Sequence, residues 1–398
     1  MHVSERARAR RSRTATVVAA LAGLLLSLVF PAGAQAVQRT VAPSGSPSGS
    51  PSGSPGDLVS AERVHVPGFA LSARVWAIEY VSTDTHGAPV TVSGMVFVPR
   101  AGSDESRPIV GYAPGTHGLG DQCAPSTALR NGDDIEGALI GEYLVAGLAV
   151  AVTDYEGLGT PGDHAYMVAR SAGQSLLDVV RAAQRLEGES LPDAGPVGLT
   201  GYSQGGHAAS WAAQLAGTYA PELDLRGVAA GGTPVNLRNV AEANAGEPNF
   251  GLVLAAGIGM DTAYPELNLE SYLNDAGRTA IEELRNSCDF SPYASTDLSD
   301  YTTRDPLAEP DWRSTLEAQN VGGVVPEVPM LLYHSTHDEI IPYQDANQLW
   351  HQWCAAGADV RFERLVLTEH AATAAVASPF VTTWMTKRLA GHPAHGNC

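Results

Sequence analysis

The sequence predicts an α/β fold, with a mostly parallel sheet that has helices on both faces and a helical insertion. From Asp57 onward, short runs rich in β-branched and aromatic residues alternate with segments of helical periodicity. Several of those runs are apolar throughout, which is typical of parallel strands buried on both faces. Between about residues 236 and 320 the alternation stops, and helical patterns follow one another without a clear core strand.

The elements follow in a regular order. The first two strands are joined by a turn through His86 and Gly87, which predicts an antiparallel start to the sheet. The strands are expected at 74–82, at 90–99, within 107–118, within 143–159, at 196–203, at 328–338 and at 360–367. The helices are expected at 169–186, 207–220, 343–356 and 372–390, and the first of them has apolar residues at helical spacing.

The N-terminal residues 1–36 have the features of an export signal. A basic segment precedes the apolar run Val17–Phe30, and Ala34–Gln35–Ala36 matches a cleavage site. The apolar run is shorter than the ~20 residues that span a bilayer, so a retained anchor is the weaker alternative. Residues 37–56 contain PSGS three times and predict a disordered Pro/Ser/Gly-rich linker. Residues 57–398 would then form the folded domain, which the motifs below indicate to be catalytic.

The bulk composition narrows the classes of function. The net charge of −19 argues against a nucleic-acid surface, which requires a basic face. Cys123, Cys288, Cys354 and Cys398 make an even count in an exported chain, which suggests two disulfides with three pairings open. No C-x-x-C spacing is present, so we expect no metal site.

The stretch VGLTGYSQGGHAAS contains the pentapeptide Gly201–Gly205, of the form G-x-S-x-G, between an apolar strand and a helix. This context is the one in which a nucleophile elbow occurs, and it makes Ser203 a candidate nucleophile. The competing interpretation is a glycine-rich structural turn between a strand and a helix. A serine hydroxyl is a poor nucleophile without a base, so the chain must also supply a histidine and a carboxylate.

The candidate acid and base follow Ser203 in the order that this architecture requires. Asp338 comes just after one late strand, where it competes with the neighbouring Glu339, and His370 comes between the last strand and the last helix. The other histidines considered are on the strand and loop of the acid, on the helix after Ser203, or in the C-terminal tail: His334, His337, His207, His392 and His395.

The oxyanion hole is expected to use the backbone N–H of Gln204 and one from the loop 114–118. Gly115 allows close approach of the backbone, so Thr116 or His117 would donate, and Thr116 is the first choice. A glycine-rich loop that binds no ligand is the alternative.

Several stretches resemble the secretory lipase family of α/β-hydrolases. They are DQCAPS (121–126), TDYEGLGTPG (153–162), LLDVVRAA (176–183), GYSQGGHAA (201–209) with YAPELDLRGVAA (219–230), STHDEIIP (335–342) and EHAATAAVASP (369–379). The resemblance implies an α/β-hydrolase fold, fatty-acid esters as substrates, no cofactor, and a helical cap at about 236–320 over the acyl site. It also implies a Cys123–Cys288 disulfide, which leaves Cys354–Cys398. Many relatives carry His-Gly or a Tyr-Asp pair where this chain has Pro114–His117, so the second oxyanion donor departs from the family pattern.

Together these features predict a secreted serine ester hydrolase, a lipase or carboxylesterase, that works through an acyl-enzyme. Its expected partners are a lipid or other ester substrate and, transiently, a lipid interface, with neither nucleic acid nor an obligate protein partner. The apolar stretch 250–260 would line the acyl site or form the buried core of the cap. Two alternatives stay open: acyl transfer or peptide cleavage by the same triad at the cell envelope, and a non-catalytic envelope protein on a hydrolase scaffold.

Overall fold

The computed structural model describes residues 51–101, 106–366 and 368–398. The expected export signal and residues 37–50 of the expected linker lie outside the described residues. Among the described helices, none combines the length and the apolar character that crossing a bilayer requires.

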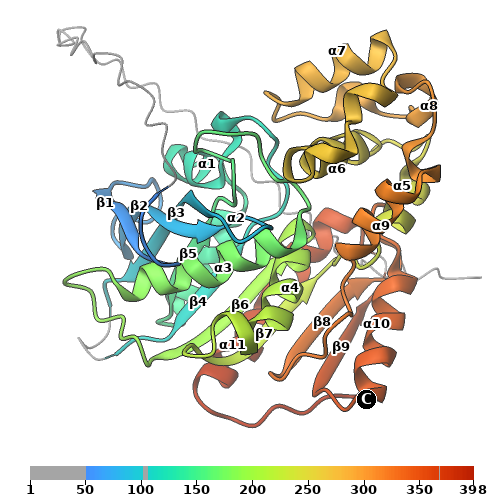
Figure 1. The fold of residues 1–398 in the computed structure, drawn as a ribbon. Helices are drawn as coiled ribbons and strands as arrows, with labels where there is room; N and C mark the ends of the chain where they lie inside the picture. The colour runs from blue at the N-terminus through green and yellow to red at the C-terminus, as the bar shows by residue number, and fades with distance from the viewer. Residues whose placement is uncertain (1–50, 102–105, 367) are drawn as a thin grey trace, which may run out of the picture. The chain divides into compact units, whose positions relative to one another are not determined.

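The described chain contains a nine-stranded sheet with the order β1-β2-β3-β5-β4-β6-β7-β8-β9 (Figure 1). The strands are β1 (Leu58–Val64), β2 (Ala73–Thr83), β3 (Pro89–Pro99), β4 (Ile109–Ala113), β5 (Ala149–Thr153), β6 (Pro196–Tyr202), β7 (Asp224–Gly231), β8 (Met330–Ser335) and β9 (Val360–Leu365). Strands β1, β2 and β3 pair antiparallel, β3 pairs antiparallel with β5, and the pairs from β5 to β9 are parallel. The expected antiparallel start and mostly parallel sheet are therefore confirmed.

Helices cover both faces of this sheet. One apolar cluster joins it to α3 (Ala169–Gln184), α4 (Gln204–Tyr219) and α10 (Tyr343–Ala355), and a second joins it to α2 (Glu136–Val145) and α11 (His370–Leu389). Neighbouring strand residues divide between the clusters, as Leu332 and Leu331 do on β8, because successive side chains point to opposite faces. The parallel strands β4, β5 and β8 are thus buried on both sides, which explains their apolar character, whereas the edge strand β9 is partly exposed.

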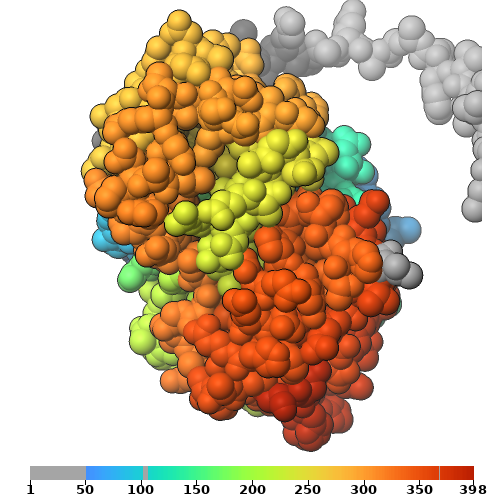
Figure 2. Space-filling model, turned by 90° about the vertical axis from the view of Figure 1, so that its right-hand side faces the viewer, coloured from blue at the N-terminus to red at the C-terminus, as the bar shows by residue number. Residues whose placement is uncertain are grey.

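The chain between β7 and β8 is helical and has an apolar core of its own. Its elements are α5 (Leu237–Asn244), α6 (Gly251–Ala263), η2 (Pro265–Leu267), η3 (Leu269–Tyr272), α7 (Asp275–Leu284), η4 (Ser291–Tyr293), α8 (Leu298–Tyr301), η5 (Pro306–Ala308) and α9 (Pro310–Ala318). A cluster that includes Phe250, Ile258 and Trp312 holds these helices together, with Tyr166 from the loop after β5. In Figure 2 this segment, yellow to orange, forms a lobe beside the orange-red to red C-terminal elements.

Some elements were not expected from the sequence. Strand β1, the short helices η1 (Asp121–Cys123) and α1 (Pro125–Asn131), and helix α2 belong to this group. Helix α11 begins at His370, two residues before the expected start, so this histidine is the first residue of the helix instead of a loop residue. Two disulfides, Cys123–Cys288 and Cys354–Cys398, have the pairing that the family resemblance implies.

Candidate active site

Ser203 occupies a strained turn between β6 and α4. Its backbone has φ 59° and ψ −120°, in the left-handed half of conformational space that non-glycine residues rarely adopt. Its N–H donates to the carbonyl of Gly231 on the neighbouring strand at 2.9 Å. The residue is partly exposed although its neighbours on both sides are buried. Backbone strain therefore coincides with the one hydroxyl of this turn that can reach a ligand.

The glycines around Ser203 allow the backbone segments to approach closely. A Cβ at Gly201 would lie 2.2 Å from the carbonyl oxygen of Gly205. A Cβ at Gly205 would lie 1.9 Å from the carbonyl oxygen of Ala113, at the end of β4. No side chain can rotate away from such a backbone contact, so both positions require glycine. The G-x-S-x-G pattern is thus explained by steric contacts across the turn and to the next strand.

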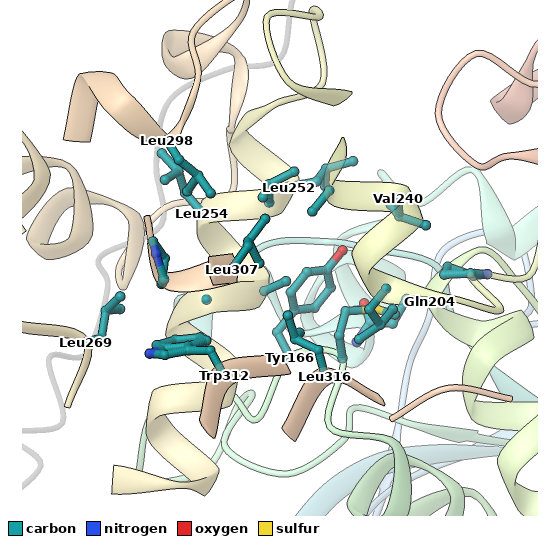
Figure 3. Close-up of a pocket in the computed structure, with 18 of the residues that line it drawn as sticks. Tyr166, Gln204, Val240, Leu252, Leu254, Leu269, Leu298, Leu307, Trp312 and Leu316 are labelled. Atoms are coloured by element: carbon teal, nitrogen blue, oxygen red, sulfur yellow. The ribbon is translucent and has the colours of Figure 1, made fainter. Parts of the chain in front are cut away.

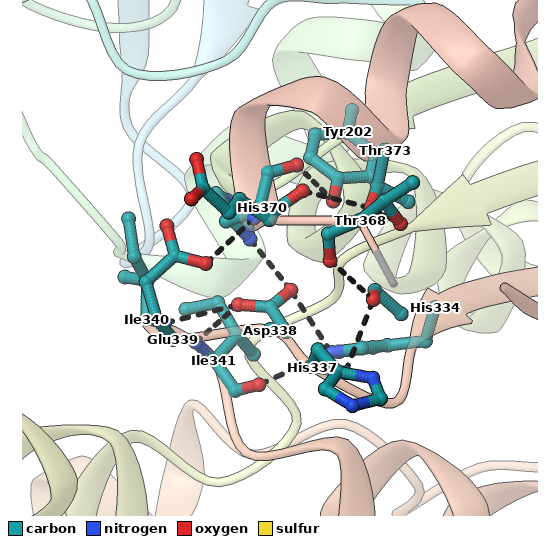
Figure 4. Close-up of polar contacts among 12 residues, drawn as sticks. Tyr202, His334, His337, Asp338, Glu339, Ile340, Ile341, Thr368, His370 and Thr373 are labelled. Atoms are coloured by element: carbon teal, nitrogen blue, oxygen red, sulfur yellow. Dashed lines mark hydrogen bonds and ion pairs between the residues drawn. The ribbon is translucent and has the colours of Figure 1, made fainter. Parts of the chain in front are cut away.

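Asp338 and His370 lie together at the carboxyl ends of β8 and β9 (Figure 4). Asp338 Oδ2 is 2.7 Å from His370 Nδ1, while Oδ1 accepts the backbone N–H groups of Ile340 and Ile341 at 3.0 and 2.8 Å. Burial alone would raise the pKa of Asp338, but hydrogen bonds from His334 and His370 outweigh it and hold that pKa well below its usual range. The carboxylate is therefore charged and fixed in orientation.

The backbone of His370 is held on both sides. Tyr202, next to Ser203, donates its hydroxyl to the His370 carbonyl at 2.7 Å, and the two rings are 5.0 Å apart. Glu339, the rival acid, accepts the His370 backbone N–H at 2.8 Å, so it contacts the main chain and not the imidazole. Among the described contacts, the His370 imidazole is hydrogen-bonded to Asp338 and not to the Ser203 hydroxyl. A hydrogen bond between base and nucleophile is often long without substrate and shortens when substrate binds.

The rival histidines have different surroundings. His207 on α4 is fully buried, and its Nε2–H donates to the Gln319 carbonyl oxygen at 2.9 Å. Burial lowers the pKa of His207 to about 4. His334 on β8 is also buried, and its Nε2 is 3.2 Å from Asp338 Oδ2 and 3.1 Å from the Ile341 carbonyl oxygen. His334 thus contacts the acid, a contact that the sequence analysis missed.

The loop 114–118 follows β4 and begins against the turn that carries Ser203, as the close approach of Gly205 to Ala113 and Pro114 shows. Gln204 is the first residue of α4, so its backbone N–H has no partner within the helix. Thr116 contacts the hydroxyl of Tyr166 through its side chain at 2.8 Å. In the described part of the chain, no backbone hydrogen bond uses the Thr116 N–H, whereas the Gly115 N–H is taken by Glu136.

Several neighbours of this loop were not expected from the sequence. Tyr155 donates its hydroxyl to the Pro114 carbonyl at 2.6 Å, and His164 Nε2 is 3.1 Å from the side-chain amide of Gln204. Burial lowers the pKa of His164 to about 4, so it is neutral and accepts from that amide. These residues and Tyr166 follow β5, at the same edge of the sheet as Ser203. Their place after a parallel strand is the signal that could have identified them.

An apolar cavity adjoins Ser203 and Gln204. Its wall is formed by residues of α5, α6, η3, α8, η5 and α9 together with the loop after β5. In Figure 3, Gln204 lies at one end, while Leu298 and Leu269 lie toward the other. Val253, Leu254 and Gly257 show that part of the stretch 250–260 lines this cavity. Within the described residues, no group of three or more His, Cys, Asp or Glu side chains is arranged to hold a metal ion.

Comparison with known proteins matches residues 126–397 to the model of the family described as "Secretory lipase". The chain belongs to the secretory lipase family. A secreted triacylglycerol lipase of Malassezia globosa is 32% identical to it over 345 residues, which cover 81% of this chain and 74% of that protein. Another member, of Mycobacterium tuberculosis, is 30% identical over 79% of this chain and 73% of its own length, and is named a probable inactive lipase.

The solved structures include Candida antarctica lipase A in its closed state, with a TM-score of 0.77 and 26% identity over 85% of this chain and 84% of that one. This secretory lipase therefore has the α/β-hydrolase fold. Its family and its structural neighbours identify it as a lipase-like carboxylic ester hydrolase.

Proposed function

We propose that this secretory lipase is an extracellular serine hydrolase that cleaves fatty-acyl esters. The observation that carries the proposal is the apolar cavity, which opens at the strained Ser203 and extends among the helices between β7 and β8. A long acyl chain requires such an apolar site beside the reacting carbonyl. The helices of residues 236–320 would then act as a cap that buries the acyl chain, as the Cys123–Cys288 link to the core supports.

In the proposed mechanism, Ser203 Oγ attacks the ester carbonyl carbon while His370 Nε2 takes its proton. Asp338 orients the imidazole through Nδ1 and stabilises the imidazolium that forms. The backbone N–H groups of Gln204 and Thr116 donate to the oxyanion of the tetrahedral intermediate. His370 then protonates the departing alcohol, which leaves an acyl-enzyme on Ser203. A water that loses its proton to His370 attacks this ester and releases the fatty acid.

The choice of Thr116 as second donor is supported by elimination within the loop. Gly115 cannot donate because its N–H is bound to Glu136 at 2.7 Å. Thr116 is the next residue, and its side chain contacts Tyr166, which lines the cavity. Thr116 therefore lies beside a side chain that lines the proposed acyl site.

The test is hydrolysis of nitrophenyl esters from acetate to palmitate by the wild type and by Ser203→Ala. Ser210→Ala is the matched control, because Ser210 lies on α4, is buried, and its hydroxyl has no hydrogen-bond partner among the described residues. We expect a long-chain optimum that disappears in Ser203→Ala and persists in Ser210→Ala. Equal activity of Ser203→Ala and wild type would overturn the mechanism. A rate increase above the solubility limit of the substrate would identify a lipase rather than an esterase.

One relative supports a second candidate, a non-catalytic protein on the same scaffold. The Mycobacterium tuberculosis member is named a probable inactive lipase. Labelling with a fluorophosphonate separates the two: a reactive Ser203 supports the hydrolase, and an unreactive Ser203 in folded protein supports the non-catalytic alternative.

A further inference from the structure

Two side chains hold the peptide groups of Gly115 in the loop after β4. Glu136 Oε1 accepts the Gly115 N–H at 2.7 Å, and His117 Nδ1 lies 2.9 Å from the Gly115 carbonyl oxygen. Glu136 is the first residue of α2, 21 positions along the chain, so this contact is tertiary. Both polar groups of one backbone residue are thus fixed by side chains.

The contact on the carbonyl determines where the next N–H points. The carbonyl of Gly115 and the N–H of Thr116 belong to the same peptide unit, which is planar and trans. They therefore point in opposite directions, and a hydrogen bond that fixes the carbonyl also fixes the N–H. His117 in this way sets the direction of the N–H that the proposed mechanism assigns to the oxyanion.

A third residue closes a ring of contacts around the imidazole. His117 Nε2 is 3.0 Å from Asp134 Oδ2, and Asp134 Oδ1 accepts the backbone N–H of Glu136 at 2.8 Å. Both nitrogens of the imidazole face acceptors, which requires both to carry a proton. Burial alone would lower the pKa of His117, but the hydrogen bond to Asp134 and the charge of Glu136 raise it to about 9.

The position of the Glu136 carboxylate is unfavourable for the stability of the folded protein. Its Oε2 is buried and has no hydrogen-bond partner among the described residues. Burial raises the pKa of Glu136 to about 6, although the charge of His117 and the Gly115 N–H partly offset it. A buried carboxylate with an oxygen left unpaired is costly for stability, which favours a role in holding the Gly115 backbone.

We propose that Glu136 and His117 form a clamp that positions the oxyanion hole. Glu136 anchors Gly115, and His117 orients the Gly115–Thr116 peptide so that the Thr116 N–H faces the developing charge. The inference rests on the proposed function. Neither side chain touches the substrate, so both are positioning residues.

The test compares Glu136→Ala, Glu136→Gln and His117→Ala with Glu142→Ala, using a nitrophenyl ester of the preferred chain length. Glu142 is the matched control: it lies on the same helix, and its Oε2 accepts from Ser378 at 2.8 Å and Thr382 at 3.2 Å, away from the loop. Thermal unfolding of each variant shows whether it is folded.

We expect Glu136→Ala and His117→Ala to lower kcat by about 10- to 100-fold with KM changed less than about threefold, because the oxyanion hole acts in the transition state. Glu136→Gln should recover most of that loss, since its amide oxygen can accept the same N–H. A kcat in Glu136→Ala equal to that of Glu142→Ala, or a loss confined to KM, would overturn the clamp. Loss of all Ser203 dependence would instead overturn the proposed function, so the two failures are distinguishable.

Discussion

The closest backbone approach in the site is at Gly205, and it predicts the effect of a single methyl group. In Gly205→Ala the new Cβ would lie 1.9 Å from the Ala113 carbonyl oxygen and 2.9 Å from the Pro114 carbonyl oxygen. Both atoms belong to the backbone of the oxyanion strand and loop. Because real Cβ contacts do not fall below 3.0 Å, helix α4 and strand β4 must separate by about 1 Å.

This separation moves the Gln204 N–H away from the Thr116 N–H. A misplacement of about 1 Å in a catalytic site costs on the order of 100-fold in rate. Overpacking of this kind also costs about 1–3 kcal/mol of stability. The assays are kcat/KM on nitrophenyl butyrate and urea denaturation.

Gly141→Ala is the matched control, because a Cβ there meets no atom within 4 Å and the residue lies inside helix α2. We expect that variant to keep its activity and to gain about 0.5–1 kcal/mol, since alanine favours the helix. A Gly205→Ala enzyme with unchanged stability and unchanged kcat/KM would refute the steric explanation of the turn.

Three further predictions concern other parts of the molecule. Removal of the Cys354–Cys398 disulfide by double substitution to serine should cost about 4 kcal/mol in urea denaturation, because the bond closes a loop across 44 positions; an unchanged midpoint would contradict this. The raised pKa of His117 contributes stability that is full below pH 6.5 and is lost as the pH rises through about 9. The difference in unfolding free energy between wild type and His117→Ala should therefore shrink over that range. A constant difference would show that His117 does not titrate as described. Leu254→Trp, which narrows the cavity, should lower kcat/KM for palmitate about 10-fold relative to butyrate, and an equal effect on both esters would place the acyl chain elsewhere.

Much of the sheet could be predicted because its strands carry local signals. Strands buried on both faces read as apolar runs, and amphipathic helices such as α3 show their periodicity directly. Helix α2 was missed for a physical reason: its apolar residues run on through Leu148 into β5 without a polar break, and only the turn at Gly147, with φ 83°, separates them. Strand β1 is mostly exposed on both faces and therefore lacks an alternating pattern.

The candidate site likewise contains residues that the sequence could place and residues that it could not. Ser203, Asp338 and His370 could be placed because each follows a recognisable strand, and the structure brings Asp338 and His370 into contact. The positioning role of Glu136 and His117 could not be predicted, because their partners are backbone atoms and residues of other elements. A charged residue at the start of a helix usually faces solvent, and only the fold shows that Glu136 is turned inward to Gly115.

The most direct test of the central claim is to find the atom that carries the acyl group. The wild type would be mixed with a long-chain nitrophenyl phosphonate, which mimics the tetrahedral intermediate, and the modified peptide would be identified by mass spectrometry. Attachment to Ser203 with loss of one nitrophenolate per chain, slowed at least 100-fold in His370→Ala, is the predicted result. A protein that is folded and disulfide-bonded but remains unmodified, or is modified at another residue, would contradict the assignment of Ser203 as the nucleophile.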